Sequence, residues 1–121
     1  MILVDTSVWI DHLRKSDATL SGLLKQRSVL IHSMVIGEIS VGSYRNRDGI
    51  LFDLGLLPTA TAATDGEVLR FISHNKLYAT GIGYIDAHLL ASVRLTPGAT
   101  LWTRDKRLAK AAESLNLAFV P

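Results

Sequence analysis

The sequence contains no cysteine, only three prolines and no long apolar run. Without cysteine, the chain can have no disulfide framework, no zinc site built on thiolates and no cysteine nucleophile. The few prolines, together with 48% hydrophobic and 20% charged residues, indicate a globular rather than a disordered chain. The longest uncharged stretch, residues 54–64, is well short of the roughly 18 apolar residues that cross a bilayer. We therefore expect no membrane partner and, by default, a cytoplasmic protein.

Short apolar runs alternate with segments of helical periodicity along the chain. Strands are predicted at 2–4, 29–31 and 100–102, with further short strands at 57–61 and 118–120. Helices are predicted around 8–13, 20–24, 34–45, 50–57, 68–77, 84–95 and 108–115, with Ser33 and Thr103 as caps. This alternation indicates an α/β protein in which helices cover both faces of a parallel sheet. The length of 121 residues predicts a single domain, residues 1–121.

Two acidic residues follow predicted strands. Asp5 comes directly after the first strand, and Asp105 lies just beyond Trp102, at the start of the last helix. The carboxyl ends of parallel strands meet at one edge of a sheet, where functional groups gather. A carboxylate at either position is also favourable at a helix N-terminus, so each acid taken singly has a purely structural interpretation.

Two further acids lie on apolar helix faces. At 100° per residue, Leu90 lies about 40° from Asp86, and Met34 lies about −40° from Glu38. An isolated ionised carboxylate on such a face is costly and needs a cation or hydrogen-bond donors. Each of these acids is therefore paired either with a protein group, such as a hydroxyl or, for Glu38, Arg45 two turns away, or with a metal ion.

Taken together, the four acids point to a metal site. With no cysteine and no histidine pair at ligand spacing, they suit a hard cation such as Mg²⁺ or Mn²⁺. Such a cation activates water and neutralises charge on a phosphate, which implies phosphodiester hydrolysis leaving 5′-phosphate and 3′-hydroxyl ends. With four of the eleven acidic residues in this site, seven remain against thirteen Lys and Arg. The rest of the surface then suits a polyanionic partner.

Four blocks of sequence carry a family resemblance. They are DTSVWI from Asp5, EI followed by Gly42 from Glu38, GYIDAHLLA from Gly83, and LWTRDKRL from Leu101. In this order they resemble the four motifs of the PIN-domain family and, more narrowly, those of the VapC toxins of bacterial toxin–antitoxin pairs. The resemblance runs over nearly the whole chain, and its last two blocks are the most specific.

The resemblance implies a PIN-like three-layer α/β/α fold with a central parallel sheet of four or five short strands. It implies an endoribonuclease in which Asp5, Glu38, Asp86 and Asp105 surround Mg²⁺ or Mn²⁺ as the catalytic and metal-binding residues. It also implies an RNA substrate, a VapB-type antitoxin that holds the enzyme inactive, and a homodimer. All four acidic positions are present, so the resemblance predicts an active enzyme.

Polar residues beside the acids are candidates for supporting roles. Three hydroxyl side chains are predicted to hold the carboxylates or the activated water: Thr6, Ser7 and Thr103. Each is also a favourable helix cap. Three cations flank the last acid and are predicted to contact RNA phosphates: Arg104, Lys106 and Arg107. A solvated helix start explains these cations equally well.

Two other classes of protein share the size and the acidic metal site. A phosphoacceptor receiver domain has an adjacent acid pair after its first strand, whereas Asp5 is followed by Thr6 and Ser7. A metal-dependent phosphatase of small molecules has Asp-x-Asp there, and Ser7 stands in place of its second acid. The intact set of four acids also argues against a PIN relative that only binds.

Overall fold

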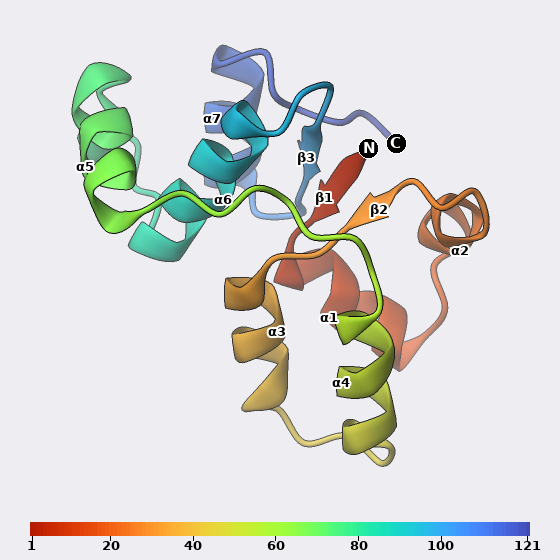
Figure 1. The fold of residues 1–121 in the computed structure, drawn as a ribbon. Helices are drawn as coiled ribbons and strands as arrows, with labels where there is room; N and C mark the ends of the chain where they lie inside the picture. The colour runs from red at the N-terminus through yellow and green to blue at the C-terminus, as the bar shows by residue number, and fades with distance from the viewer.

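A three-stranded parallel sheet lies at the centre of the computed structural model, which describes residues 1–121 (Figure 1). β1 (Ile2–Val4) lies between β2 (Val29–Leu30) and β3 (Thr100–Trp102). In the register, Ile2 pairs with Val29 on one side of β1 and with the first residue of β3 on the other. The strands are almost wholly apolar, as expected for parallel strands that are covered on both faces.

The sheet has three strands rather than the four or five that the sequence suggests. The chain at Thr59 contributes a single parallel bridge to Ile31, and the chain at Ala118 a single parallel bridge to Leu101. Pro58 has no N–H group, so pairing next to Thr59 does not extend into a ladder. Both segments pair where short strands were predicted, but the predicted lengths are wrong.

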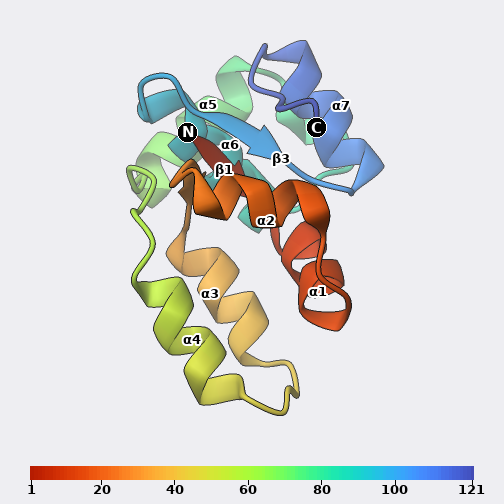
Figure 2. The ribbon, with the colours of Figure 1, turned by 90° about the vertical axis from the view of Figure 1, so that its right-hand side faces the viewer.

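Seven α-helices and one 3₁₀ turn surround the sheet. Their bounds are α1 Thr6–Arg14, α2 Ala18–Lys25, α3 Ser33–Ser40, α4 Arg47–Gly55, α5 Asp65–His74, η1 Leu77–Ala79, α6 Tyr84–Leu95 and α7 Lys106–Ser114. Helices α1 to α4 lie on one side of the sheet and α5 to α7 on the other (Figures 1 and 2). This is the expected three-layer α/β/α arrangement. None of the helices has the length and apolar character needed to cross a membrane.

The core is a continuous cluster built around the strands. Leu3, Val4 and Leu101 are buried in it, and α6 is buried from Ala87 to Val93. Burial of apolar surface contributes about 25 cal/mol per Å², so this cluster is the main source of stability. Because the strands are held from both faces, the residues directly after β1 and β3 are fixed at one edge of the sheet.

The helix after β2 is shorter than predicted, and its cap differs. The helix predicted at 34–45 ends at Ser40, because Gly42 and Ser43 just beyond it have low helix propensity. Its N-cap is His32 rather than Ser33, and the His32 Nδ1 accepts a hydrogen bond from the Met34 N–H at 3.0 Å. A histidine is not a favoured cap residue, so the sequence pattern pointed to its neighbour.

The other helices lie close to their predicted positions. The helix predicted at 84–95 has these bounds as α6, whereas those predicted at 50–57 and 108–115 begin earlier, at Arg47 and Lys106. Polar first turns conceal such starts, since the apolar pattern begins only where the helix meets the core.

Candidate active site

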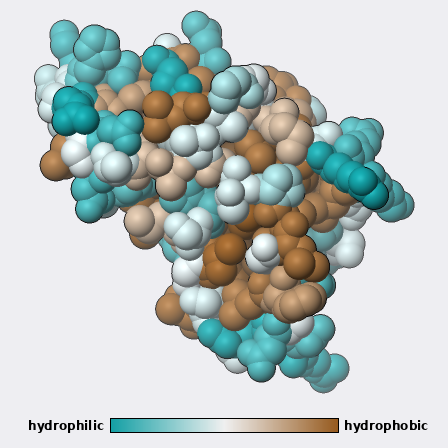
Figure 3. All heavy atoms as spheres, in the orientation of Figure 1, coloured by the Kyte–Doolittle hydropathy of each residue, from teal (hydrophilic) through white to brown (hydrophobic).

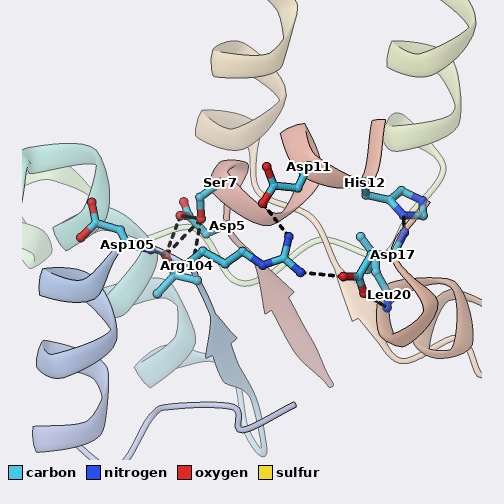
Figure 4. Close-up of polar contacts among 9 residues, drawn as sticks. Asp5, Ser7, Asp11, His12, Asp17, Leu20, Arg104 and Asp105 are labelled. Carbon is cyan, nitrogen blue, oxygen red and sulfur yellow. Dashed lines mark hydrogen bonds and ion pairs between the residues drawn. The ribbon is translucent and has the colours of Figure 1, made fainter. Parts of the chain in front are cut away.

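Asp5 lies directly after β1, at the N-cap position of α1, and only 6% of its surface is exposed. Its side chain makes no capping hydrogen bond to the helix. Oδ2 instead accepts hydrogen bonds from the hydroxyls of Ser7 and Thr103, both at 2.7 Å (Figure 4). Thr103 follows β3, so groups from two neighbouring strand ends meet at this carboxylate.

Asp105 is the N-cap residue of α7. Its Oδ1 accepts hydrogen bonds from the backbone N–H groups of Arg107 at 2.9 Å and Leu108 at 3.1 Å. Its own N–H donates to the hydroxyl oxygen of Thr103 at 3.1 Å. Thr103 therefore links Asp5 with Asp105, and the cap of α7 is Asp105 rather than the predicted Thr103.

Glu38 projects from α3 toward α1. Its Oε1 accepts a hydrogen bond from the Thr6 hydroxyl at 2.7 Å, across 32 positions in the sequence. Of the two protein partners that the sequence allowed, the hydroxyl rather than Arg45 is the one present. Since Thr6 directly follows Asp5, this bond brings the helix acid close to the acid at the strand end.

Asp86 lies in the first turn of α6, where its Oδ2 accepts a hydrogen bond from the Gly83 N–H at 3.2 Å. Burial is the largest cause that raises the pKa of this carboxyl, and the Gly83 hydrogen bond opposes it. The negative charges of Asp5, Asp105 and Glu38 raise the pKa of Asp86 further. The structure thus brings all four predicted acids into one electrostatic neighbourhood.

Each of the four carboxylates keeps one oxygen free of protein donors. The oxygens that accept protein hydrogen bonds are Oδ2 of Asp5, Oε1 of Glu38, Oδ2 of Asp86 and Oδ1 of Asp105. The second oxygen of each acid accepts no hydrogen bond from a protein group. Hydroxyl and N–H donors therefore orient every acid while leaving an oxygen that a hard cation could bind.

The donor set fits Mg²⁺ or Mn²⁺ in its chemistry, since it consists of carboxylate oxygens supported by neutral donors. With the side chains as they stand, no three acidic or histidine groups are close enough together to coordinate one ion. Each carboxylate is instead held by its own protein donors. Binding a cation would require the free oxygens to converge by side-chain rotation.

The three hydroxyl residues singled out in the sequence all bind carboxylates. Thr6 donates to Glu38, whereas Ser7 and Thr103 donate to Asp5. None of the three is the N-cap residue of a helix. The supporting interpretation thus accounts for their contacts better than the capping one.

The Arg104 side chain does not extend toward the four predicted site acids. Its guanidinium donates to Asp11 at 2.7 Å and to Asp17 at 2.6 Å, and its Cζ lies 5.6 Å from the centroid of the Trp102 ring. Figure 4 shows this guanidinium directed away from Asp5. Sequence reasoning missed both acidic partners, because they lie 93 and 87 positions from Arg104 and no local pattern connects them.

A second polar cluster joins α6 to its neighbours without a hydrogen bond to the four acids. Asp65 Oδ1 accepts from the Tyr84 hydroxyl at 2.8 Å and lies 3.1 Å from the Nε2 of His88. The Nε2 of His32 lies 3.0 Å from the Ser92 hydroxyl. Burial, followed by the charge of His88, lowers the pKa of His32. These histidines join secondary-structure elements, and the sequence predicted no catalytic pairing for them.

Comparison with known proteins agrees with this geometry. A family model described as "PIN domain" matches residues 2–114. Two curated relatives from two strains of Mycobacterium tuberculosis, both named "Ribonuclease VapC32", are each 50% identical over 115 residues. The match covers 94% of this chain and 93% of each relative. The family resemblance inferred from the four sequence blocks is confirmed. The chain therefore belongs to the PIN-domain family, among its VapC-type members.

Proposed function

We propose that this chain is a metal-dependent endoribonuclease and the toxin of a type II toxin–antitoxin pair. Its metal-binding and catalytic residues are Asp5, Glu38, Asp86 and Asp105. The observation that carries the proposal is the gathering of four oriented carboxylates, each with one oxygen free of protein donors. Both relatives are named as VapC ribonucleases, which supports RNA as the substrate class.

The proposed reaction is hydrolysis of a phosphodiester bond, with a divalent cation held by the four carboxylates. Mg²⁺ or Mn²⁺, when bound, would supply an activated water and neutralise charge developing on the scissile phosphate. Ser7 and Thr103 orient Asp5, Thr6 orients Glu38, and each hydroxyl thereby leaves one carboxylate oxygen for the cation. A water nucleophile does not need the 2′-hydroxyl of RNA, so the products carry 5′-phosphate and 3′-hydroxyl ends.

Among the cations near the site, Lys106 and Arg107 are the proposed contacts to RNA phosphates. They are the first two residues of α7, directly after Asp105, and no protein acceptor binds either side chain. Arg104, which the sequence placed with them, already has two carboxylate partners. We therefore assign Arg104 to the support of the site rather than to the substrate.

We further propose a VapB-type antitoxin as the partner of this chain, a homodimer as its assembled form, and the cytoplasm as its location. Hydrophobic side chains gather on the face of the molecule where α1, α3 and α4 lie (Figure 3). At the ends of α3 and α4, Val41 is 88% and Leu56 is 70% exposed, and Phe52 on α4 is 68% exposed. Apolar side chains exposed to this degree are typical of surfaces that bind other proteins.

Cleavage of RNA by the purified chain tests the proposed activity. We expect cutting with Mg²⁺ or Mn²⁺, none in EDTA, and loss of cutting in Asp5→Asn and in Glu38→Gln. Asp53→Asn, which neutralises an exposed acid on α4, is the matched control and should cut like wild type. Full activity in EDTA or in Asp5→Asn, or products ending in 2′,3′-cyclic phosphates, would overturn the proposal.

A further inference from the structure

A pocket of about 420 Å³ lies between α7 and the turn that follows η1. Its lining residues are Ala79, Thr80, Arg107, Lys110, Ala111 and Ser114. Two of them are cations and none is acidic. From Arg107 to Ser114 the pocket follows about 10 Å of helix, at 1.5 Å per residue.

Both walls of this pocket continue directly into the site of the four acids. On one wall, Arg107 donates its backbone N–H to Oδ1 of Asp105 at 2.9 Å. On the other wall, the turn at Thr80 leads within three residues to Gly83, whose N–H donates to Asp86 at 3.2 Å. The pocket is therefore held by the same two segments that hold two of the carboxylates.

The two cations of the pocket have no partner in the protein. The side chains of Arg107 and Lys110 donate no hydrogen bond to a protein group and form no ion pair. Arg104, in contrast, pairs with two carboxylates. They lie three residues apart on α7, a spacing at which like charges repel. An anion placed between them would relieve this repulsion.

The turn opposite α7 leaves room for the guanidinium. Gly81 has φ +80, and a Cβ there would lie 3.2 Å from Cδ and 3.3 Å from Nη1 of Arg107. A larger residue would be strained by this backbone conformation, and the Arg107 side chain would have to shift by a few tenths of an ångström to make room for it. The glycine at this turn thus allows the Arg107 side chain to lie close against the backbone.

We propose that this pocket binds a backbone phosphate of the RNA next to the phosphodiester bond that is cut, with Arg107 and Lys110 as its ligands. The inference rests on the proposed function, because it takes the nearby carboxylates as the cleavage site. A guanidinium matches a phosphate with two parallel hydrogen bonds, and an ammonium adds a second positive charge. The two walls of the pocket lead directly to Asp105 and Asp86, so an RNA strand cut at the carboxylates would place a neighbouring phosphate in the pocket. This favours RNA over an acidic protein segment as the occupant.

Binding of a single-stranded RNA, measured over a range of salt concentrations, tests the pocket. All proteins carry Asp86→Asn to prevent cleavage, and Arg107→Gln and Lys110→Gln are compared with the control Lys25→Gln. Lys25 is an exposed cation at the end of α2, on the other side of the sheet. We expect each pocket variant to bind about tenfold more weakly, with a salt slope shallower by roughly 0.7 to 1. The control should be unchanged, and thermal melting should show that all the variants fold.

Cleavage by the wild-type chain is measured alongside and separates the two proposals. If wild type cuts RNA but the pocket variants bind it as tightly as the control, the pocket proposal is overturned while the proposed function stands. If wild type does not cut RNA and the pocket variants lose affinity and salt slope, the proposed function fails and the phosphate site is supported. If the two cations affect binding of an acidic protein partner but not of RNA, the pocket belongs to that partner and the inference is wrong.

Discussion

At the residue scale, the Thr103 side chain is hydrogen-bonded to two of the four acids, Asp5 and Asp105. Its hydroxyl donates to Asp5 at 2.7 Å and accepts from the N–H of Asp105 at 3.1 Å. It also lies 3.3 Å from the Ser7 hydroxyl, which donates to the same Asp5 oxygen. One hydroxyl thus sets the relative position of a carboxylate after β1 and a carboxylate after β3.

We predict that Thr103→Val lowers the rate of RNA cleavage by about 10- to 100-fold, the usual cost of losing a group that orients metal ligands. Valine keeps the shape of the side chain but cannot donate to Asp5, whereas Thr103→Ser retains the hydroxyl and should keep most of the activity. Cleavage rates at increasing Mn²⁺ concentrations would also show weaker use of the metal in Thr103→Val. Equal rates for the two variants would mean that the hydroxyl has no part in placing the acids.

The candidate acids were predictable from the sequence, but how each is held was not. Helical periodicity placed Asp86 and Glu38 on apolar faces. Half-buried Asp86 has the raised pKa that such a position implies, whereas Glu38 is exposed, so the predicted burial of Glu38 is wrong. For Asp5 and Asp105 the sequence left capping as an alternative. Both acids are N-cap residues, but only the Asp105 side chain accepts capping hydrogen bonds from its helix. The Asp5 side chain is instead bound by the hydroxyls of Ser7 and Thr103, and Thr103 lies 98 positions away, beyond the reach of a local pattern.

At the scale of elements, Arg104 joins three pieces of structure. Its guanidinium connects the loop after β3 to Asp11 on α1 and to Asp17, the N-cap of α2. Asp17 Oδ1 accepts from the Leu20 N–H, while Oδ2 accepts from Arg104. The hydrogen bond from the Leu20 N–H, followed by the hydrogen bond from Arg104, lowers the pKa of Asp17. Arg104 thus anchors the loop that carries Thr103 and Asp105 to α1 and to the start of α2, on the side away from the four site acids.

We predict that Arg104→Gln lowers stability by about 1 kcal/mol, since partly exposed ion pairs contribute roughly 0.2–1 kcal/mol each. It should lower kcat for RNA cleavage with little change in KM, because the loop would hold the acids less firmly. The matched control is Arg47→Gln, which removes an exposed ion pair with Asp48. Urea unfolding at low and high salt, together with cleavage kinetics, measures both effects. A weaker RNA affinity with a shallower salt slope would instead mean that Arg104 contacts a phosphate.

Elements were easier to predict than their ends. The runs at 2–4, 29–31 and 100–102 became strands because they are apolar and bounded by polar residues. The single bridges at Thr59 and Ala118 fall short of the predicted strands, since backbone pairing there depends on distant neighbours. Ion pairs across 87 or more positions, such as those of Arg104, lie beyond any periodic pattern.

At the scale of the whole molecule, charge is unevenly distributed. Thirteen Lys and Arg outnumber eleven Asp and Glu, yet four of the acids share one region. A raised folded-state pKa, as at Asp86, means that the protonated acid is favoured in the folded protein. Its contribution to stability is therefore fully present below the unfolded-state pKa near 4, and it is lost as pH rises through the folded-state value. At neutral pH without a metal ion, the ionised Asp86 carboxylate therefore opposes folding.

We predict that Asp86→Asn raises the melting temperature in EDTA at pH 7, by roughly 3–6 °C if the relieved destabilisation is about 1 kcal/mol. The asparagine amide oxygen still accepts the Gly83 N–H hydrogen bond, so the start of α6 is preserved. Near pH 3 the difference should shrink, because the aspartic acid is then protonated as well. Excess Mn²⁺ should stabilise wild type more than the variant, since binding to the folded state adds stability and the variant lacks one of the four carboxylates. Melting curves of both proteins with EDTA and with Mn²⁺ measure these differences. A variant that melts below wild type in EDTA and gains equally from Mn²⁺ would identify Asp86 as a structural acid outside the metal site.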